Sequence, residues 1–199
     1  MNTVQKTLRI TFILFFSILF FSCNNQNEKP NIVWLVTEDN SIHYMNLYAK
    51  GGAEMPAISA LANQGVVFDN AFSYSPVCSV ARSTILTGAY APRIGTQYHR
   101  KMSQVKLPDN IKPFPIYLKQ AGYYVTNNAK EDYNFIKEEK IWDESSLKAT
   151  YKNRKVGQPF FHVQNFHNTH EGKLHFNEKQ LSEALESNNL DSIKPFPYH

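Results

Sequence analysis

Four groups of polar residues in this sequence combine residue types and spacing that suit a reaction site. In chain order they are the acidic pair Glu38 and Asp39, the pair Cys78 and Arg82, Lys130 with Asp132, and His170. Carboxylates are hard oxygen ligands for a divalent cation, and a cysteine in the right surroundings becomes a nucleophile. Lysine and arginine bind anions, and imidazole transfers protons near neutral pH. These residues are therefore the candidates for a reaction site.

The polar groups follow apolar runs that predict strands and helices in alternation. Residues 31–37 are almost continuously apolar, which predicts a strand buried on both faces. Further strands are predicted at 66–68, 123–126 and 160–166, and helices at 56–63, 79–86, 115–121 and 177–188. Residues 137–155 are polar and predict no clear element.

This alternation favours an α/β fold with a doubly wound sheet flanked by helices. Sites in such sheets form at the carboxyl ends of the strands. The acidic pair, Lys130 and His170 each follow a predicted strand, so we expect them at one edge of the sheet. If Cys78 begins a helix, the helix dipole adds positive potential there, and Arg82 one turn later faces the same side.

The first 22 residues predict an export signal. Lys6 and Arg9 precede an apolar run over residues 10–21 that is short for a membrane span, and Cys23 opens a polar stretch. The pattern resembles a bacterial lipoprotein signal that is cleaved before Cys23, whose sulfur then carries a lipid that holds the protein to the membrane. An ordinary signal peptide or an uncleaved anchor is the alternative. We therefore expect a signal at 1–22, a polar tether at 23–29, one domain over 30–199, and export to the periplasm or the outer membrane and cell surface.

Composition restricts the function classes. The 199 residues are 42% hydrophobic and 14% aromatic, with 21 Lys+Arg against 17 Asp+Glu and a net charge of +4. These values exclude a disordered tail, a collagen and a multi-span membrane protein. Without residues 1–22 the net charge is +2, which permits an anionic substrate and does not favour nucleic acid as a partner. If Cys23 is lipidated, Cys78 is the only other cysteine, so no intramolecular disulfide can form.

Residues 76–88, Pro-Val-Cys-Ser-Val-Ala-Arg-Ser-Thr-Ile-Leu-Thr-Gly, resemble the signature of the sulfatase family, in which the cysteine is oxidised to formylglycine. Three further segments resemble family motifs in the same order. They are residues 30–39 with an acidic metal pair, 122–130 ending in an active-site lysine, and 159–170 ending in an active-site histidine. Residues 37–40 and 127–128 most resemble the heparan N-sulfatase-like (sulfamidase) branch.

The resemblance implies an alkaline-phosphatase-like fold and hydrolysis of a sulfuric ester or N-sulfate, with a sulfated glycan as substrate. It implies that formylglycine from Cys78, made by a formylglycine-forming maturation enzyme, is hydrated and attacks sulfur. One divalent cation, usually calcium in this family, would be held by the acidic pair and residue 78. Arg82 would hydrogen-bond the modified residue, Lys130 would bind sulfate, and His170 would contact sulfate or protonate the leaving group.

Several positions depart from the family pattern. Val80 stands where Pro or Ala is usual, which bears on recognition by the maturation enzyme. Asp132 stands where a histidine is frequent, and it could act as the base that breaks down the sulfated intermediate. The metal pair is Glu-Asp rather than Asp-Asp. The family also takes a second acidic pair and another lysine from later in its chain, so we expect the N-terminal part of a catalytic domain, inactive alone and truncated at the C-terminus.

Each assignment has a structural alternative. Cys78 could be a buried thiol, the acidic pair a solvated strand end, and Lys130 a surface partner of Glu131. His162 is expected to be a satisfied polar residue on its strand, and His167 could be a supporting residue of the site. His162, His167 and His170 could instead together suggest zinc.

Two other function classes stay open. One is a phosphoryl-transfer relative in the same superfamily, although the cysteine and Arg82 count against it. The other is a non-catalytic surface lipoprotein that binds carbohydrate through its aromatic residues.

Overall fold

The computed structural model describes residues 28–138 and 140–187. The chain divides into two compact units, Met1–Pro30 and Asn31–His199, and every element below belongs to the second. The predicted signal and Cys23 lie outside the described residues. Within the described part of the chain, no helix is long and apolar enough to cross a membrane.

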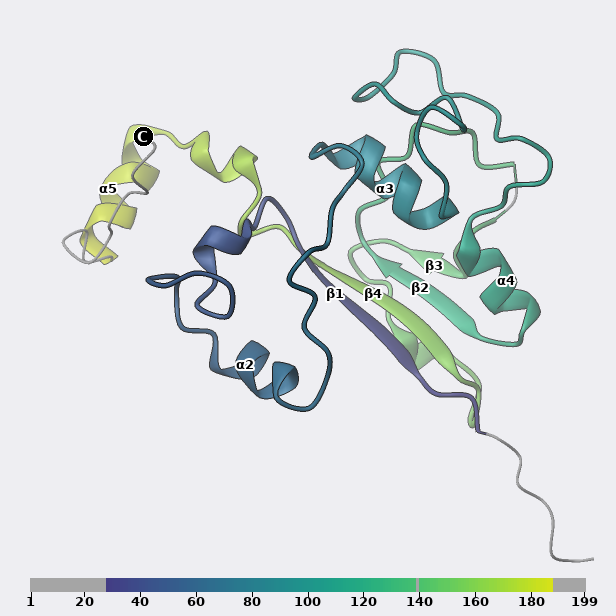
Figure 1. The fold of residues 1–199 in the computed structure, drawn as a ribbon, viewed down its shortest axis with the longest axis horizontal. Helices are drawn as coiled ribbons and strands as arrows, with labels where there is room; N and C mark the ends of the chain where they lie inside the picture. The colour runs from purple at the N-terminus through teal and green to yellow at the C-terminus, as the bar shows by residue number, and fades with distance from the viewer. Residues whose placement is uncertain (1–27, 139, 188–199) are drawn as a thin grey trace, which may run out of the picture. The chain divides into compact units, whose positions relative to one another are not determined.

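Four parallel strands form one sheet in the order β1-β4-β2-β3 (Figure 1). Their bounds are β1 Ile32–Thr37, β2 Tyr124–Asn128, β3 Glu144–Ser145 and β4 Phe160–Phe166. The last strand in the sequence lies between the first two, with Trp34 beside Val163 and Val125 beside Phe161. Because all strands run the same way, the segments that follow β1, β2 and β4 leave the sheet at one edge.

The helices lie between and after these strands. They are α2 Pro56–Ala62, α3 Cys78–Thr87, α4 Phe114–Gln120 and α5 Glu178–Ser187, with short 3-10 turns η1 Ile42–Tyr44, η2 Tyr151–Asn153 and η3 Glu171–Leu174. Proline occupies the first turn of α2 and of α4, where its missing N–H costs nothing. Helix α3 ends at Gly88, whose φ of 63° is the left-handed conformation that glycine adopts without strain.

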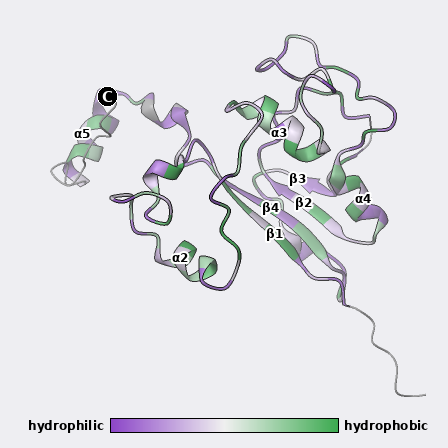
Figure 2. Cartoon of the chain, in the orientation of Figure 1, coloured by the Kyte–Doolittle hydropathy of each residue, from purple (hydrophilic) through white to green (hydrophobic). Residues whose placement is uncertain are grey.

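The core lies between one face of the sheet and helices α3 and α4. Phe161 and Val125 are fully buried there, together with Leu86 of α3 and Ile116 of α4. Trp34 packs its ring 5.2 Å from that of Phe161 in an edge-on arrangement. Burial of each large apolar side chain contributes about 1.5–3 kcal/mol, so this face holds β1, β4 and β2 in register. Figure 2 shows hydrophobic residues along β1 and β4.

The opposite face of the sheet is only partly covered. Tyr151 of η2 stacks on Phe160 with ring centroids 4.5 Å apart, which covers β4 and β2. On β1, Val33 and Leu35 point to this face and are 50% and 56% exposed. The expectation that the first strand is buried on both faces was therefore wrong, because these two side chains stay about half exposed.

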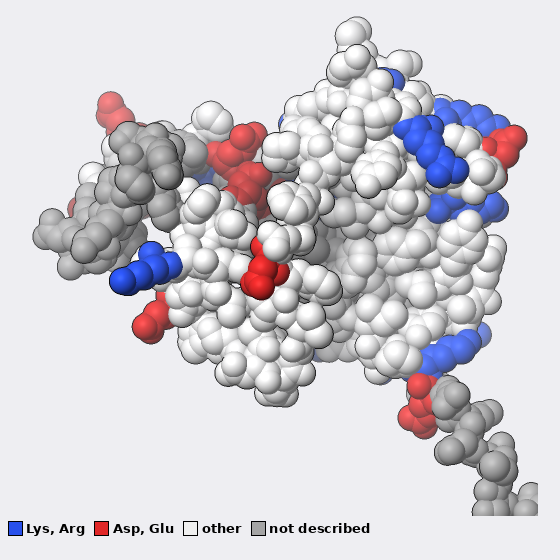
Figure 3. Space-filling model, in the orientation of Figure 1, with Lys and Arg blue, Asp and Glu red and all other residues white. Residues whose placement is uncertain are grey.

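Most predicted elements are confirmed within one or two residues. The strand predicted at 66–68 was wrong: those residues form no strand, and Val66 and Phe68 are 78% and 70% exposed. A run this short becomes a strand only with a pairing partner, and the fold offers none there. Figure 3 shows a large area without acidic or basic side chains on the face it presents. The two-residue strand β3 lies within the polar segment that gave no prediction.

Candidate active site

The predicted site residues meet at the carboxyl edge of the sheet. Glu38 follows β1, Lys130 follows β2, and His170 follows β4, while Cys78 is the first residue of α3. Candidate ligand atoms of Glu38, Cys78 and His170 all lie within 4.8 Å of one another. The Nζ of Lys130 lies 3.5 Å from the Cys78 Sγ. The α/β topology thus brings together residues that are up to 132 positions apart in the sequence.

Glu38 is the centre of this cluster. It is 5% exposed, and its Oε2 forms an ion pair with Lys130 and lies 3.7 Å from Nε2 of His170. Its Oε1 lies 3.4 Å from Nη2 of Arg82 and 3.0 Å from Nδ1 of His167. A carboxylate this deeply buried is tolerated because cationic and N–H groups surround both of its oxygens. The sequence had suggested His167 only as a supporting residue, whereas it contacts Glu38 directly.

The ring of His170 has a defined orientation. Its Nδ1 accepts a hydrogen bond from the backbone N–H of Gly172 at 2.9 Å. An acceptor nitrogen carries no proton, so the proton of the neutral ring is on Nε2, the nitrogen that faces Glu38. His170 can therefore donate a hydrogen bond toward the site.

Arg82 joins α3 to the ends of two strands. Its Nη1 donates to the backbone oxygen of Lys130 at 3.0 Å, and its Nη2 donates to Oδ1 of Asn165 at 2.9 Å. Asn165 is buried and donates from Nδ2 to Asn127 Oδ1 at 3.0 Å and to the Asn128 backbone oxygen at 2.8 Å. Sequence reasoning missed Asn165, although its place near the end of a strong strand was the available signal.

Asp39 lies beside the cluster and takes a different partner. Its φ is 50°, and its Oδ2 accepts a hydrogen bond from the backbone N–H of Glu171 at 2.8 Å. The neighbouring Thr169 Oγ1 accepts from the backbone N–H of Glu38 at 3.2 Å and donates to the Glu38 backbone oxygen. These bonds tie the end of β1 to the loop after β4 and so fix where the acidic pair lies.

Asp132 pairs with a residue that the sequence analysis did not single out for catalysis. Its Oδ2 lies 3.2 Å from Nη2 of Arg100, and its φ is 51°. The hydrogen bond and the charge of Asp132 raise the pKa of the Arg100 guanidinium. The structure thus places the carboxylate of Asp132 on Arg100, and its predicted role as a base stays a prediction.

A cavity of about 550 Å³ opens over the cluster, with Glu38, Asp39, Cys78, Arg82 and Lys130 in its lining. Its walls are largely apolar and include Trp34 and Trp142. A second cavity of about 340 Å³ shares Lys130 with it and is also lined by His167 and His170. Both are large enough for a sugar unit with its sulfate.

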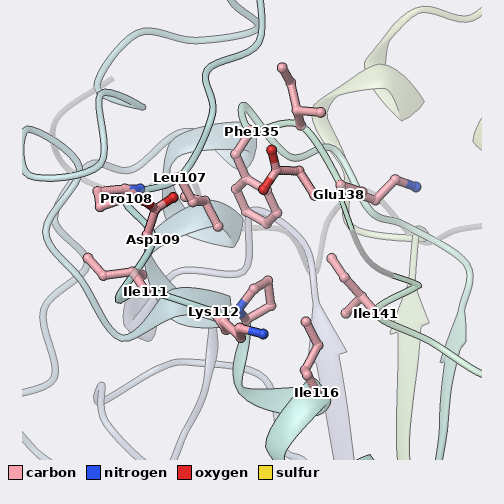
Figure 4. A pocket seen from close by; sticks show the side chains of 12 residues that line it. Leu107, Pro108, Asp109, Ile111, Lys112, Ile116, Phe135, Glu138 and Ile141 are labelled. Atoms are coloured by element: carbon pink, nitrogen blue, oxygen red, sulfur yellow. The ribbon is translucent and has the colours of Figure 1, made fainter.

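A third cavity of about 230 Å³ lies among Leu107, Ile116, Phe135 and Ile141 (Figure 4). It shares no lining residue with the two cavities of the cluster. Its lining includes the charged residues Asp109, Lys112, Lys137 and Glu138, and among the described residues that line it none is a cysteine, serine, threonine or histidine.

His162 is separate from the cluster. Its Nδ1 lies 2.7 Å from Thr126 Oγ1, and burial lowers the pKa of its imidazole. The expectation of a satisfied polar residue on the strand is confirmed. Among the described residues, the His, Cys and acidic side chains grouped closely enough for a metal are Glu38, Cys78 and His170, so a site of the three histidines is not supported.

The arrangement can be compared with known proteins. The chain matches the sulfatase family over residues 30–193. It belongs to the sulfatase family. An ulvan-active sulfatase of Formosa agariphila is 41% identical over 157 residues, which is 74% of this chain and 26% of that protein. An N-acetylglucosamine-6-O-sulfatase of Bacteroides thetaiotaomicron is 27% identical over 130 residues, or 63% of this chain and 22% of that protein. The chain thus spans about a quarter of the length of these curated sulfatases.

Solved sulfatase-like structures share the fold. One, determined in complex with its substrate D-glucosamine-2-N,6-O-disulfate, aligns with a TM-score of 0.58 at 22% identity, over 72% of this chain and 35% of that one. A 2-O GAG sulfatase aligns with a TM-score of 0.60 at 17% identity, over 72% of this chain and 36% of that one. The predicted α/β, alkaline-phosphatase-like fold is confirmed.

Proposed function

We propose that this sulfatase hydrolyses sulfate esters of a sulfated polysaccharide, with residue 78 as the nucleophile. The observation that supports this best is the position of Cys78, at the first turn of α3 and 3.5 Å from the Nζ of Lys130. The N-terminus of α3 adds positive potential at the same point. A sulfate ester is anionic and resists nucleophiles, so a site must neutralise its charge before attack, and this cluster is built of such groups. Sulfated glycans are the substrates named for the curated relatives.

The nucleophile we propose is the hydrate of formylglycine, formed from Cys78 by an oxidative maturation enzyme. One hydroxyl of the hydrate would give up its proton and form the bond to sulfur, while the ester oxygen would leave with the carbohydrate and take up a proton. The second hydroxyl then loses its proton, sulfate is expelled, and the aldehyde is restored; water rehydrates it. Val80, where the family has Pro or Ala, is fully buried in the first turn of α3, so its side chain bears on the folded helix as well as on maturation.

The other residues hold charge and protons in place. The Lys130 side chain is 13% exposed, and its ammonium group can exchange its ion pair with Glu38 for one with a sulfate oxygen. His170, with its N–H at Nε2, is placed to donate a hydrogen bond to a sulfate oxygen or to the leaving oxygen. Arg82 is held by Asn165 and the Lys130 backbone, so it can orient residue 78 from the same helix. Asp132, on this proposal, accepts the proton of the second hydroxyl.

The cluster also fits a divalent cation such as calcium. Glu38 offers a buried carboxylate whose ligand oxygen lies within 4.8 Å of the Cys78 Sγ and of a ring nitrogen of His170, and a cation bound there would displace Lys130 from Glu38. Asp39 is adjacent and would supply a second carboxylate, and the hydrated residue 78 would add oxygen. A bound cation would withdraw charge from the sulfate and lower the pKa of a nearby hydroxyl.

Mass spectrometry and sulfate release test the proposal together. The full chain would be produced with and without a formylglycine-forming enzyme, and the peptide that contains residue 78 would be weighed. We expect the mass of formylglycine in the first preparation and of cysteine in the second. Release of sulfate from ulvan oligosaccharides, measured on the complete protein with this chain as its N-terminal part, is expected only after maturation. Cys78→Ala is the control.

An unmodified Cys78 beside a maturation enzyme that modifies a known sulfatase would contradict the proposal. Retained carbohydrate binding that Cys78→Ala leaves unchanged, without sulfate release, would favour the binding lipoprotein instead.

We also propose that the protein is exported and held to a membrane by a lipid on Cys23. This rests on the basic, apolar and polar succession of the first 29 residues. Incorporation of labelled fatty acid into the protein, lost in Cys23→Ser, would support it. A full-length N-terminus in the cytoplasmic fraction would contradict it.

A further inference from the structure

Arg100 borders the candidate site without belonging to the sulfatase motifs. It lines the 340 Å³ cavity together with Lys130, His167, His170 and Lys173. The side chains that line this cavity are all basic or imidazole groups, and Gly172 completes the wall. A cavity with such a lining is suited to an anionic ligand.

Arg100 is held in place at both its backbone and its side chain. Its backbone N–H donates to Oγ of the fully buried Ser79, which directly follows the nucleophile position, at 2.9 Å. Its Nε and Nη2 donate to the two carboxylate oxygens of Asp132 at 3.4 and 3.2 Å. This forked pairing uses one edge of the guanidinium, and Nη1 has no hydrogen-bond partner in the part of the chain that the structure describes.

The backbone at this point is strained. Among the described non-glycine residues, positive φ angles occur at Asp39, Arg100 and Asp132, with values of 50°, 41° and 51°. All three border the candidate site, and two of them are partners in the same ion pair. Strained backbone persists where the surrounding structure determines it, and it concentrates at functional sites. The Arg100–Asp132 pair is therefore a fixed part of this region rather than a chance surface contact.

We propose that Arg100, positioned by Asp132 and Ser79, binds a second anionic group of the substrate next to the sulfate that is cleaved. Lys173 lies on the wall of the same cavity and contributes a further positive charge. The Nη1 side of the Arg100 guanidinium, which does not contact Asp132, suits a planar carboxylate or a sulfate on the same or the adjoining sugar. The inference rests on the proposed function and names its substrate class: a polyanionic saccharide rather than an isolated sulfate ester.

Equilibrium binding measured by calorimetry on the full chain tests this without turnover. One pair of probes is a sulfated disaccharide with a uronate and its methyl ester; the other is glucosamine 2-N,6-O-disulfate and glucosamine 6-O-sulfate. Within at least one pair, we expect the wild type to bind the more anionic sugar about tenfold more tightly, because one good charged hydrogen bond contributes about that factor. The pair that shows the difference identifies carboxylate or sulfate as the second group.

Arg100→Ala is expected to bring that ratio close to one, and Arg100→Lys to restore part of it. Lys173→Ala, an exposed change that leaves the fold unaffected, is expected to lower the ratio severalfold. Lys106→Ala removes an exposed positive charge outside the cavity and is expected to leave the ratio unchanged. Equal affinities within both pairs in the wild type, or an unchanged ratio in Arg100→Ala and Lys173→Ala, would overturn this inference alone. No binding of any probe by the wild type would overturn it together with the proposed function.

Discussion

Arg82 donates a hydrogen bond from Nη2 to the buried Oδ1 of Asn165 at 2.9 Å, across 83 positions of sequence. This bond fastens the first turns of α3, where the nucleophile position lies, to the end of the central strand β4. The site therefore depends on a side chain that performs no chemistry in the proposed reaction.

The first prediction concerns this fastening. Asn165→Ala removes the acceptor for Arg82 and leaves Oδ1 of the buried Asn127 without its donor. We expect a loss of about 1–3 kcal/mol in the free energy of unfolding, because buried polar groups then lack partners. Urea denaturation measures it, and Asn110→Ala, an exposed asparagine, is expected to change the value by less than about 0.5 kcal/mol. Equal effects from both variants would contradict the role of Asn165.

This bond also shows where sequence reasoning succeeded and failed. The strong apolar run predicted β4 with its observed bounds, and the α/β alternation placed Glu38, Lys130 and His170 at one edge. Strand periodicity does not reveal which polar residues near a strand end bond to one another. The hydrogen bond between Arg82 and Asn165 and the Arg100–Asp132 ion pair could therefore be found only in the structure.

The prediction that the strand at residues 31–37 is buried on both faces was wrong for a different reason. An apolar run predicts a strand and indicates a preference for burial on both faces, but burial depends on what packs there. In the described chain Val33 and Leu35 are only about half covered on the second face.

The second prediction concerns calcium. If Glu38 and Asp39 help to hold the cation with a Kd on the order of 1 mM, 10 mM calcium adds about 1.4 kcal/mol to the stability of the folded chain. Thermal unfolding with calcium, compared with unfolding in a chelator, measures the effect. Glu38→Gln is expected to abolish the calcium effect, whereas Glu54→Gln, an exposed acidic residue, is expected to keep it. The same calcium shift in Glu38→Gln as in the wild type would exclude this site.

The third prediction concerns Tyr133, which burial gives a raised pKa. Its hydroxyl accepts a hydrogen bond from Nε1 of the buried Trp142 at 3.2 Å. Tyr133→Phe leaves that N–H without a partner, and we expect a loss of about 1–3 kcal/mol in unfolding free energy. Tyr117→Phe, on the half-exposed face of α4, is the matched control and is expected to be neutral. A neutral Tyr133→Phe would show that another group or water satisfies Trp142.

The fourth prediction concerns the pH dependence of stability through His162. Burial holds the pKa of its imidazole below the ordinary value of 6.5, so the unfolded chain binds the proton more readily than the folded chain. The contribution is complete above pH 6.5 and is lost as the pH falls below it, with a slope of at most about 1.4 kcal/mol per pH unit. Unfolding free energies measured between pH 5 and 7.5, roughly the range in which histidine titrates, should show this loss.

His162→Gln is expected to flatten that part of the profile, while His175→Gln, an exposed histidine, is expected to leave it as it is. An unchanged slope in His162→Gln would assign the acid sensitivity to other groups.

The position of β4 between β1 and β2 has a consequence for the order of events during synthesis. The ribosome releases β1 and β2 before β4, yet β1 has no neighbour in the sheet, and β2 only the two-residue β3, until residues 160–166 emerge. Glu38 and Lys130 therefore have no common framework while the first 159 residues are being made. If residue 78 is modified as proposed, an enzyme that needs extended chain would have to act on the segment around Cys78 during that interval. Insertion of β4 between β1 and β2 then brings Glu38 and Lys130 together beside Cys78, so the site is assembled only at this late step.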